Sequence, residues 1–477
     1  MNKYASFFWF FLVLVNPIVF AQSNPVPLLY QPLSPASITP GHAGFTLRVH
    51  GTGFRAGAVV KWNGHPLKTV FLSNSALRAD VPAGAVAKPA TGSVTVANPG
   101  TIVSNVIYLP VRWSSSTVTV ATDPAVIETG EAVVGDFNND SKPDTAVANN
   151  TGSDEVFPDV YLGLGGGKFT KVQGAAFPFG RDLNVGNIAA DFNNDGNLDL
   201  TICDQLGNGG VPCSIFLGDG KGGLTYTNLL AFGPAVAADV NGDGNLDAIA
   251  TPMASLASIT ELTIYLGNGD GTFRIESIVD LNDFGGLAVL GDFNGDGRLD
   301  VAIPTPHDNV VAVLLGNGDG TFQSEIDYPA PAPFSAVVTD VNGDGKLDIV
   351  SSGSQLGAGG VAVLLGNGDG TFGTSTSLAL PCGADLNIAD LNGDGKLDLV
   401  TLSTDNAGNQ TVNIALGNGD GTFQSPLALP APNQLIPSGL ISIADFNNDG
   451  HLDFVISGSL NPCCPTPGTV LLQTRPK

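Results

Sequence analysis

Hydrophobic residues recur along most of the chain in runs of four to seven positions, separated by clusters of Gly, Asn and Asp. Between 287 and 328, such runs occupy 287–290, 299–303 and 310–315, and a less regular run follows at 323–328. The runs are rich in Val, Ile and Leu and show no sustained helical period, which is typical of β-strands. Runs this apolar indicate strands buried on both faces, as in sheets stacked on one another. We therefore expect an all-β chain.

A nine-residue pattern, Asp-x-Asn-x-Asp-Gly-x-x-Asp, recurs seven times at intervals of 48 to 55 residues, with departures only in the first copy. Each copy lies between the first and second of four strand-like runs. Four strands per repeat, seven times over, predict a seven-bladed β-propeller. The chain ends one strand short after the seventh copy, whereas the run 116–122 precedes the first copy without partners. We expect 116–122 to be the outer strand of the last blade, which closes the ring.

Acidic residues exceed basic ones, with 44 Asp and Glu against 19 Lys and Arg and a net charge of −25. This balance argues against nucleic acid and anionic membrane surfaces as partners. The seven patterns alone hold 21 of the acidic residues. A pair of carboxylates ~4 Å apart repels by ~4 kcal/mol at an effective dielectric constant of about 20. Charge is therefore concentrated where it is costly without a cation.

Oxygen ligands from carboxylates, an amide and a backbone carbonyl suit Ca²⁺, and Gly at position 6 permits the sharp turn that such a loop needs. The alternative is that Asp, Asn and Gly are simply good turn formers. Seven loops with the same offsets favour calcium, with up to seven ions in a structural role. The first copy has Ser141 in place of Gly and Pro143 in place of Leu, which makes its site doubtful.

A second repeated element, Gly-Asn-Gly-Asp-Gly-Thr-Phe, occurs at 267–273, 316–322, 366–372 and 417–423. No Lys-Ser/Thr pair follows it and it opens no helix, so it is not a phosphate-binding loop. Asn-Gly and Asp-Gly form tight turns. We expect a structural turn whose Phe packs between blades.

In these motifs residues 116–477 closely resemble the FG-GAP/VCBS repeat family, whose calcium-bearing blades also build the integrin α-subunit propeller. Residues 28–112 resemble the IPT/TIG family through Gly51-Thr-Gly-Phe54, Val60-Lys-Trp-Asn-Gly64 and Val94-Thr-Val-Ala-Asn-Pro-Gly100. That resemblance implies an immunoglobulin-like β-sandwich, and short strands with turn signals between them agree with it. Trp62 is expected in its core.

The FG-GAP/VCBS resemblance implies Ca²⁺ ligation at positions 1, 3, 5 and 9 of each loop, and an exported protein of adhesion or recognition. The implied metal ligands are Asp136, Asn138, Asp140, Asp144, Asp191, Asn193, Asp195, Asp199, Asp239, Asn241, Asp243, Asp247, Asp292, Asn294, Asp296, Asp300, Asp340, Asn342, Asp344, Asp348, Asp390, Asn392, Asp394, Asp398, Asp445, Asn447, Asp449 and Asp453.

Residues 1–21 are typical of a secretory signal, with a positive start, an apolar run at 7–15 and Ala21 before the expected cleavage point. A membrane anchor is the alternative, but Asn16 and Pro17 end the run well short of the ~20 residues that span a bilayer. We expect a secreted, extracellular or periplasmic protein with no membrane insertion.

Five cysteines in an exported chain suggest disulfides. Cys203 and Cys213 flank a short polar loop and can pair across a hairpin. The connectivity of Cys382, Cys463 and Cys464 is left open by the sequence.

The acidic loops and the Asn-Gly turns are expected on one face of the propeller. Irregular segments such as 176–186, 281–286 and 328–335 build the other face, and variable loops on a rigid scaffold commonly bind ligands. We therefore expect an extracellular protein or glycan ligand on the face opposite the acidic loops, with the oligomeric state left open. A carbohydrate-binding lectin and a secreted, lyase-like polysaccharide-active enzyme are the alternatives.

Support for catalysis is thin. The chain has no Gly-x-Ser-x-Gly or His-Glu-x-x-His motif and no carboxylate pair outside the acidic loops. Of its five histidines, three lie in the predicted sandwich, His451 lies in the seventh acidic loop, and His307 stands alone in a loop. We therefore predict a protein that is not an enzyme.

Overall fold

The computed structural model describes residues 25–474 apart from 101–102, 116–117, 121–124, 128–131, 151–155, 175–187, 204–212, 231–234, 252–260, 283–284, 332, 354–359, 383–384, 405–409, 431–440 and 457–467. The regular structure of the described residues is almost entirely β-strand, with a short 3-10 helix, η1 (Ala83–Val86). The prediction of an all-β chain is confirmed. Among the described residues no helix is long and apolar enough to cross a membrane.

The N-terminal part is a sandwich of two four-stranded antiparallel sheets, with strand orders β1–β2–β6–β5 and β4–β3–β7–β8. Trp62 lies in the shared core, as predicted, and Gly92 leaves room for its ring, because a Cβ there would lie 2.1 Å from it. The strands are β1 (Leu28–Ser34), β2 (Phe45–Thr52), β3 (Val59–Trp62), β4 (His65–Pro66), β5 (Lys68–Ser73), β6 (Ala76–Val81), β7 (Ala90–Ala97) and β8 (Ile107–Val111).

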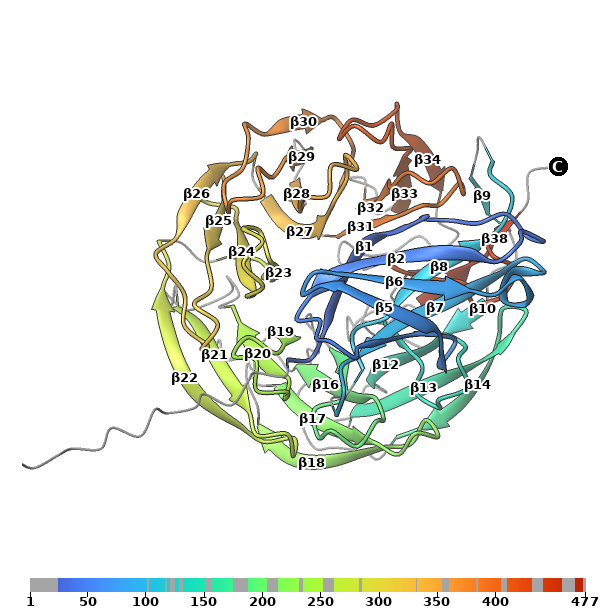
Figure 1. Cartoon of the computed structure of the whole chain (residues 1–477), viewed down its shortest axis with the longest axis horizontal. Helices are drawn as coiled ribbons and strands as arrows, with labels where there is room; N and C mark the ends of the chain where they lie inside the picture. The colour runs from blue at the N-terminus through green and yellow to red at the C-terminus, as the bar shows by residue number, and fades with distance from the viewer. Residues whose placement is uncertain are drawn as a thin grey trace, which may run out of the picture.

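Seven further four-stranded antiparallel sheets follow, one for each acidic loop, and they are arranged around a common centre (Figure 1). We call them blades 1 to 7. Blades 1 to 3 are β11 (Ala132–Gly135), β12 (Asp144–Asn150), β13 (Val156–Gly165) and β14 (Lys168–Gln173); β15 (Ala189–Ala190), β16 (Asp199–Cys203), β17 (Cys213–Gly218) and β18 (Leu224–Leu230); and β19 (Ala235–Ala238), β20 (Asp247–Ala250), β21 (Glu261–Gly267) and β22 (Phe273–Asp280).

Blades 4 to 6 are β23 (Val289–Gly291), β24 (Asp300–Thr305), β25 (Val310–Leu314) and β26 (Ile326–Pro329); β27 (Pro333–Thr339), β28 (Asp348–Gly353), β29 (Val361–Leu364) and β30 (Thr376–Leu378); and β31 (Leu386–Ala389), β32 (Asp398–Thr404), β33 (Gln410–Ala415) and β34 (Leu427–Pro430). Blade 7 combines β35 (Ile441–Ala444), β36 (Asp453–Ile456) and β37 (Gly468–Leu471) with β10 (Ala125–Ile127), which precedes the first acidic loop.

The strand that closes the ring is β10, so its predicted position at 116–122 is wrong. Within that predicted run, β9 (Thr119–Val120) pairs instead with β38 (Gln473–Thr474), beyond the end of β37. Four residues separate β9 from β10, whereas only two separate their partners Val470 and Gln473. The register therefore shifts between the two pairings, and the outer strand of blade 7 begins later in the chain than the hydrophobic pattern indicates.

The Gly-Asn-Gly-Asp-Gly-Thr-Phe turns lock neighbouring blades together. Phe372 of the blade 5 turn packs edge-on against Phe293 in the acidic loop of blade 4, with ring centroids 5.3 Å apart. Gly370 of the same turn donates its N–H to the Phe293 carbonyl at 3.0 Å. Phe273 packs on Phe192 in the same way between blades 3 and 2. The predicted role of the turn as a structural element between blades is confirmed.

Cys203 and Cys213 are opposite one another in blade 2 and form a disulfide, as predicted. Cys382 is a half-buried free thiol. Cys463, Cys464 and the predicted signal segment lie outside the described residues.

Candidate metal centre

The acidic loops connect the first and second strands of the seven blades, and the second strand of each blade starts at position 9 of its loop. We number them loops 1 to 7 along the chain: 136–144, 191–199, 239–247, 292–300, 340–348, 390–398 and 445–453. The backbone has a positive φ at positions 4 and 6, for example 77° at Gly343 and 85° at Gly345. Gly or Asn at position 4 and Gly at position 6 adopt this conformation readily, which explains the recurring residues.

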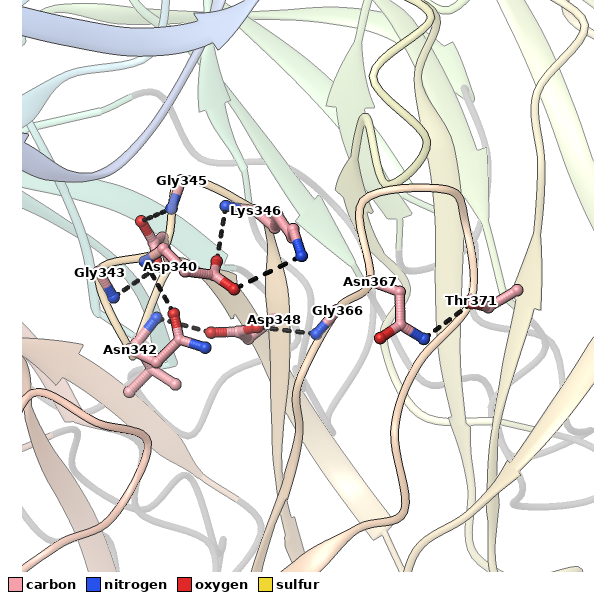
Figure 2. A network of polar contacts seen from close by, with 11 residues as sticks. Asp340, Asn342, Gly343, Gly345, Lys346, Asp348, Gly366, Asn367 and Thr371 are labelled. Atoms are coloured by element: carbon pink, nitrogen blue, oxygen red, sulfur yellow. Dashed lines mark hydrogen bonds and ion pairs between the residues drawn. The ribbon is translucent and has the colours of Figure 1, made fainter.

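The side chains at positions 1, 3 and 5 turn back onto the backbone of their own loop. In loop 5 Asp340 accepts N–H groups from Gly343 at 2.7 Å and from Gly345 at 2.8 Å (Figure 2). Asn342 accepts the N–H of Asp344 at 2.9 Å. The bonds from position 6 to position 1, from 5 to 3 and from 7 to 5 recur in all seven loops. The loop is therefore the same structure seven times.

The aspartate at position 9 is fully buried in every loop and bridges two parts of its blade. Asp348 accepts the N–H of Val341, at position 2, through Oδ2 at 2.9 Å, and the N–H of Gly366, after the third strand, through Oδ1 at 2.8 Å (Figure 2). The equivalent pair of bonds is present in all seven loops, at 2.7–2.9 Å. Position 9 thus ties the acidic loop to the third strand of its own blade, a role that the sequence pattern did not reveal.

These carboxylates are poorly compensated electrostatically. Burial is the main cause that raises the pKa at position 9, repulsion from position 1 and 5 carboxylates adds to it, and the two N–H bonds oppose it. The pKa is raised to about 6 for Asp348, about 7 for Asp144, Asp199, Asp300 and Asp398, and about 8 for Asp247 and Asp453. The structure thus holds carboxyl groups that carry their charge at neutral pH only with difficulty.

Basic side chains relieve this charge in part of the loops. Lys142 lies 2.8 Å from Asp140 in loop 1, and Lys346 lies 3.8 Å from Asp344 in loop 5. Both pairs are partly exposed, so each contributes little. Neither lysine is paired with the buried position 9 carboxylate of its loop.

The donor set of the loops fits a hard divalent cation, because it consists of carboxylate and amide oxygens around buried negative charge. Within the described ranges, no three His, Cys, Asp or Glu side chains converge closely enough to hold a metal ion as they stand. The carboxylates are instead turned toward backbone N–H groups. Each carboxylate oxygen that accepts one N–H keeps a second lone pair, and calcium ligation at positions 1, 3, 5 and 9 stays a prediction.

Loop 1 keeps the shared geometry in spite of its sequence. Asp136 accepts the N–H groups of Asp140 at 2.9 Å and Ser141 at 2.8 Å, as position 1 does elsewhere. Ser141 has a φ of 65°, a left-handed conformation that glycine takes in the other six loops. The departure therefore strains the backbone of this loop without changing its fold.

The sandwich lies against the propeller face that carries the acidic loops (Figure 1). Val26 donates its N–H to Asp239 Oδ2 of loop 3 at 2.9 Å. The N–H of Asp292 in loop 4 donates to the Tyr30 hydroxyl at 3.0 Å. In loops 3 and 4 the sandwich therefore contacts position 1, a residue that is expected to bind metal.

The other side of the sandwich contacts loops 6 and 7. Thr91 donates its hydroxyl to Asp445 Oδ2 of loop 7 at 2.7 Å. Arg112 is 2% exposed, donates Nη1 to the Leu391 carbonyl of loop 6 at 2.5 Å, and has the carboxylate of Asp390 as its strongest charged neighbour. Sequence reasoning missed Arg112, although an arginine between Val111 and Trp113 in a chain with few basic residues is a usable signal.

A sequence model described as FG-GAP-like repeat matches residues 136–202, 239–303, 292–351, 340–401 and 390–456, and a model of the IPT/TIG domain matches residues 30–111. The comparison with curated proteins gives no match.

Several solved structures are similar to the chain at low identity. A crystal structure of an auxiliary nutrient binding protein from Bacteroides ovatus is 12% identical with a TM-score of 0.37, covering 94% of this chain and 98% of that chain. BBS1N in complex with ARL6DN is 11% identical with a TM-score of 0.45, covering 76% and 98%. A functionally unknown protein from Desulfotomaculum acetoxidans is 10% identical with a TM-score of 0.44, covering 65% and 87%. Similarities at this level carry no inference about what the chain binds. The repeat matches, in contrast, extend over more than half of the chain, which therefore belongs to the FG-GAP-like repeat family and carries an IPT/TIG domain at its N-terminal end.

Proposed function

We propose that the protein is an exported recognition or adhesion protein, stabilised by calcium, whose ligand binds the propeller face opposite the acidic loops. The observation that carries this proposal is the position of the sandwich. It covers part of the acidic face through contacts with loops 3, 4, 6 and 7, so that face is partly used inside the molecule. Among the described residues, these contacts of the sandwich all lie on the acidic face.

Calcium would be held by the Asp and Asn side chains at positions 1, 3, 5 and 9. When bound, it supplies positive charge next to buried carboxylates and performs no chemistry. The chain's own residues do the rest: position 9 joins the loop to the third strand, and position 1 orders the turn. Fixing seven loops in this way makes the propeller a rigid support for variable loops.

The segments that the sequence predicts on the ligand face lie mostly outside the described residues, including 176–186 and 283–284. Tyr328 is described, and it packs on Phe372 with ring centroids 5.2 Å apart, so it anchors its segment. The proposal for this face therefore rests on the covered acidic face and on the repeat architecture.

Binding can be tested with a glycan array and a panel of extracellular proteins, both probed with the mature chain in millimolar calcium. A captured sugar would favour the lectin alternative, and a captured protein would favour adhesion. Phe284→Ser changes a residue outside the described ranges that the sequence predicts on the ligand face, and it should abolish binding. Asp270→Asn, in an exposed turn on the acidic face, should leave binding unchanged. Loss of binding in the Asp270 variant alone would contradict the proposed face.

One half-buried acid bears on the enzyme alternative. Asp385, before β31, has its pKa raised to about 6 by burial. Its carboxylate accepts the backbone N–H of Ile441, which opens the first strand of blade 7. The contact joins blades 6 and 7, which is a structural role. Assay of the mature chain on acidic and neutral polysaccharides tests catalysis directly, and any turnover lost in Asp385→Asn would favour the enzyme.

A further inference from the structure

A cavity of about 500 Å³ lies between the sandwich and the first strands of five blades. The propeller side is formed by residues of β11, β15, β19, β31 and β35. Of these strands, β19 and β31 are labelled in Figure 1 and lie toward the centre of the ring. The sandwich side is formed by β1 and by the segment 103–108. The volume is in the range of about 300–1,000 Å³ that is typical of small-molecule sites, and domain interfaces are a common place for them.

The walls of the cavity are mainly apolar and incompletely buried. Val103 and Val106 of the sandwich are each 39% exposed, although both lie between two packed domains. On the propeller side Ala189 and Ala237 line the cavity and are also only partly buried. Apolar surface left in contact with water gains about 25 cal/mol per Å² when an apolar guest covers it.

The charged residues in the described lining of the cavity are all acidic. Asp191, Asp239 and Asp390, at position 1 of loops 2, 3 and 6, contribute to its lining, and the described lining contains no Lys, Arg or His. Each of these loops carries three aspartates, so one Ca²⁺ per loop would still leave a net charge of −1. Arg112 has Asp390 as its strongest charged neighbour but does not line the cavity, so an anion in the cavity would meet acidic side chains and no basic side chain of the described lining.

We propose that this cavity is a binding site for a small, mainly apolar molecule that carries no negative charge. The apolar walls supply the affinity and the acidic rim supplies the selection by charge. The site is separate from the proposed ligand face, because it lies on the side of the propeller that the sandwich covers. Its occupant would stabilise the contact between the two domains, since both contribute walls.

Three probes with the same aromatic body test the proposal: benzylamine, benzyl alcohol and benzoate. Dissociation constants are measured by ligand-observed NMR with the mature chain in millimolar calcium, and melting temperatures by calorimetry. Benzylamine and benzyl alcohol should bind and raise the melting temperature, and benzoate should bind at least ~10-fold more weakly. Equal binding of benzoate, or no binding of the other two, would overturn the proposal.

The position of the site is tested by filling it. Ala237→Leu and Ala189→Leu, on different blades, should each raise the dissociation constants of benzylamine and benzyl alcohol by at least ~10-fold. Ala428→Leu makes the same change on the exposed outer strand β34 and should leave both constants unchanged. The two filled positions are independent, so one variant suffices if the other does not fold. Wild-type affinity in a folded Ala237 or Ala189 variant would show that the probes bind elsewhere.

Discussion

Loop 4 allows the structural role of an acidic loop to be separated from its predicted role in metal binding. Asp300, at position 9, is fully buried and accepts N–H groups from Phe293 and Gly316, each at 2.8 Å. Asp296, at position 5, is exposed and accepts the N–H of Arg298 at 2.8 Å. Both are predicted calcium ligands, but only Asp300 holds buried donors.

In chelator the two alanine variants should therefore differ. Asp300→Ala leaves two buried N–H groups without an acceptor, which costs about 1–3 kcal/mol each, or about 2–6 kcal/mol together. Removing a buried carboxylate whose pKa is raised to about 7 offsets part of this cost, so the lower half of the range is expected. Asp296→Ala exposes an N–H to water and should change stability by less than about 0.5 kcal/mol.

Differential scanning calorimetry in chelator and then in millimolar calcium distinguishes the two roles. In chelator the Asp300 variant should melt several degrees below wild type. The Asp296 variant should melt at the same temperature as wild type. In calcium both variants should lose part of the rise that wild type shows, and Asp280→Ala, an exposed aspartate outside the loops, should keep all of it. An Asp300 variant as stable as wild type in chelator would refute the role of position 9 as a bridge. An Asp296 variant with the full calcium response would refute calcium ligation at position 5.

Three further results are expected. In chelator the melting temperature should fall as the pH is raised from 5 to 8.5. The folded pKa is raised to about 8 at Asp247 and about 6 at Asp348, so these carboxyls stabilise the fold when protonated and lose that contribution as the pH rises through the folded pKa. Calcium should reduce the fall, and a melting temperature that rises with pH would contradict the raised pKa values. Ser141→Gly should raise the melting temperature and increase the free energy of unfolding by about 1 kcal/mol, because glycine adopts the left-handed conformation of this position without the steric cost of a side chain. An unchanged melting temperature in calorimetry would contradict the strain at Ser141. Arg112→Ala should loosen the sandwich from loops 6 and 7, seen as faster proteolysis near 113–118 and a larger radius of gyration by X-ray scattering; unchanged scattering and proteolysis would mean that the other contacts suffice.

Much of the fold could be predicted because the informative interactions are local. The φ values of 77° at Gly343 and 85° at Gly345 are required by the turn, so the residues that tolerate them recur wherever the turn does. The Phe that ends each Gly-Asn-Gly-Asp-Gly-Thr-Phe turn recurs for a similar reason, because the packing between blades requires it, as in the contact of Phe372 with Phe293. A repeated local requirement leaves a repeated sequence, and seven copies make it unmistakable.

A contact that occurs only once in the fold produces no repeated sequence pattern and could not be predicted in this way. Arg112 contacts Leu391, 279 residues away, and no period in the sequence connects them. The hydrophobic pattern predicts the closing strand too early in the chain, because the alternating run around Thr119 is typical of a complete strand. The register shift before Ala125 depends on where β37 ends, which the pattern does not indicate. The bridging role of position 9 could not be predicted for a different reason: the sequence does not distinguish an aspartate that ligates a metal from one that accepts two backbone N–H groups.

The position 1 aspartates of loops 3 and 7 therefore have two roles, because each accepts an N–H of its own turn and a donor from the sandwich. Asp239 orders its own turn through the N–H of Gly244 and also accepts Val26 of the sandwich. Two N–H bonds at Asp247, in the same loop, do not restore an ordinary carboxyl, because burial still raises its pKa to about 8. Partial charges on backbone donors thus offset the burial of this carboxyl only in part, and a cation bound by the loop would oppose the rise in its pKa. Since Asp239 of the same loop contacts the sandwich, such a cation would act on the domain interface as well as on the blade.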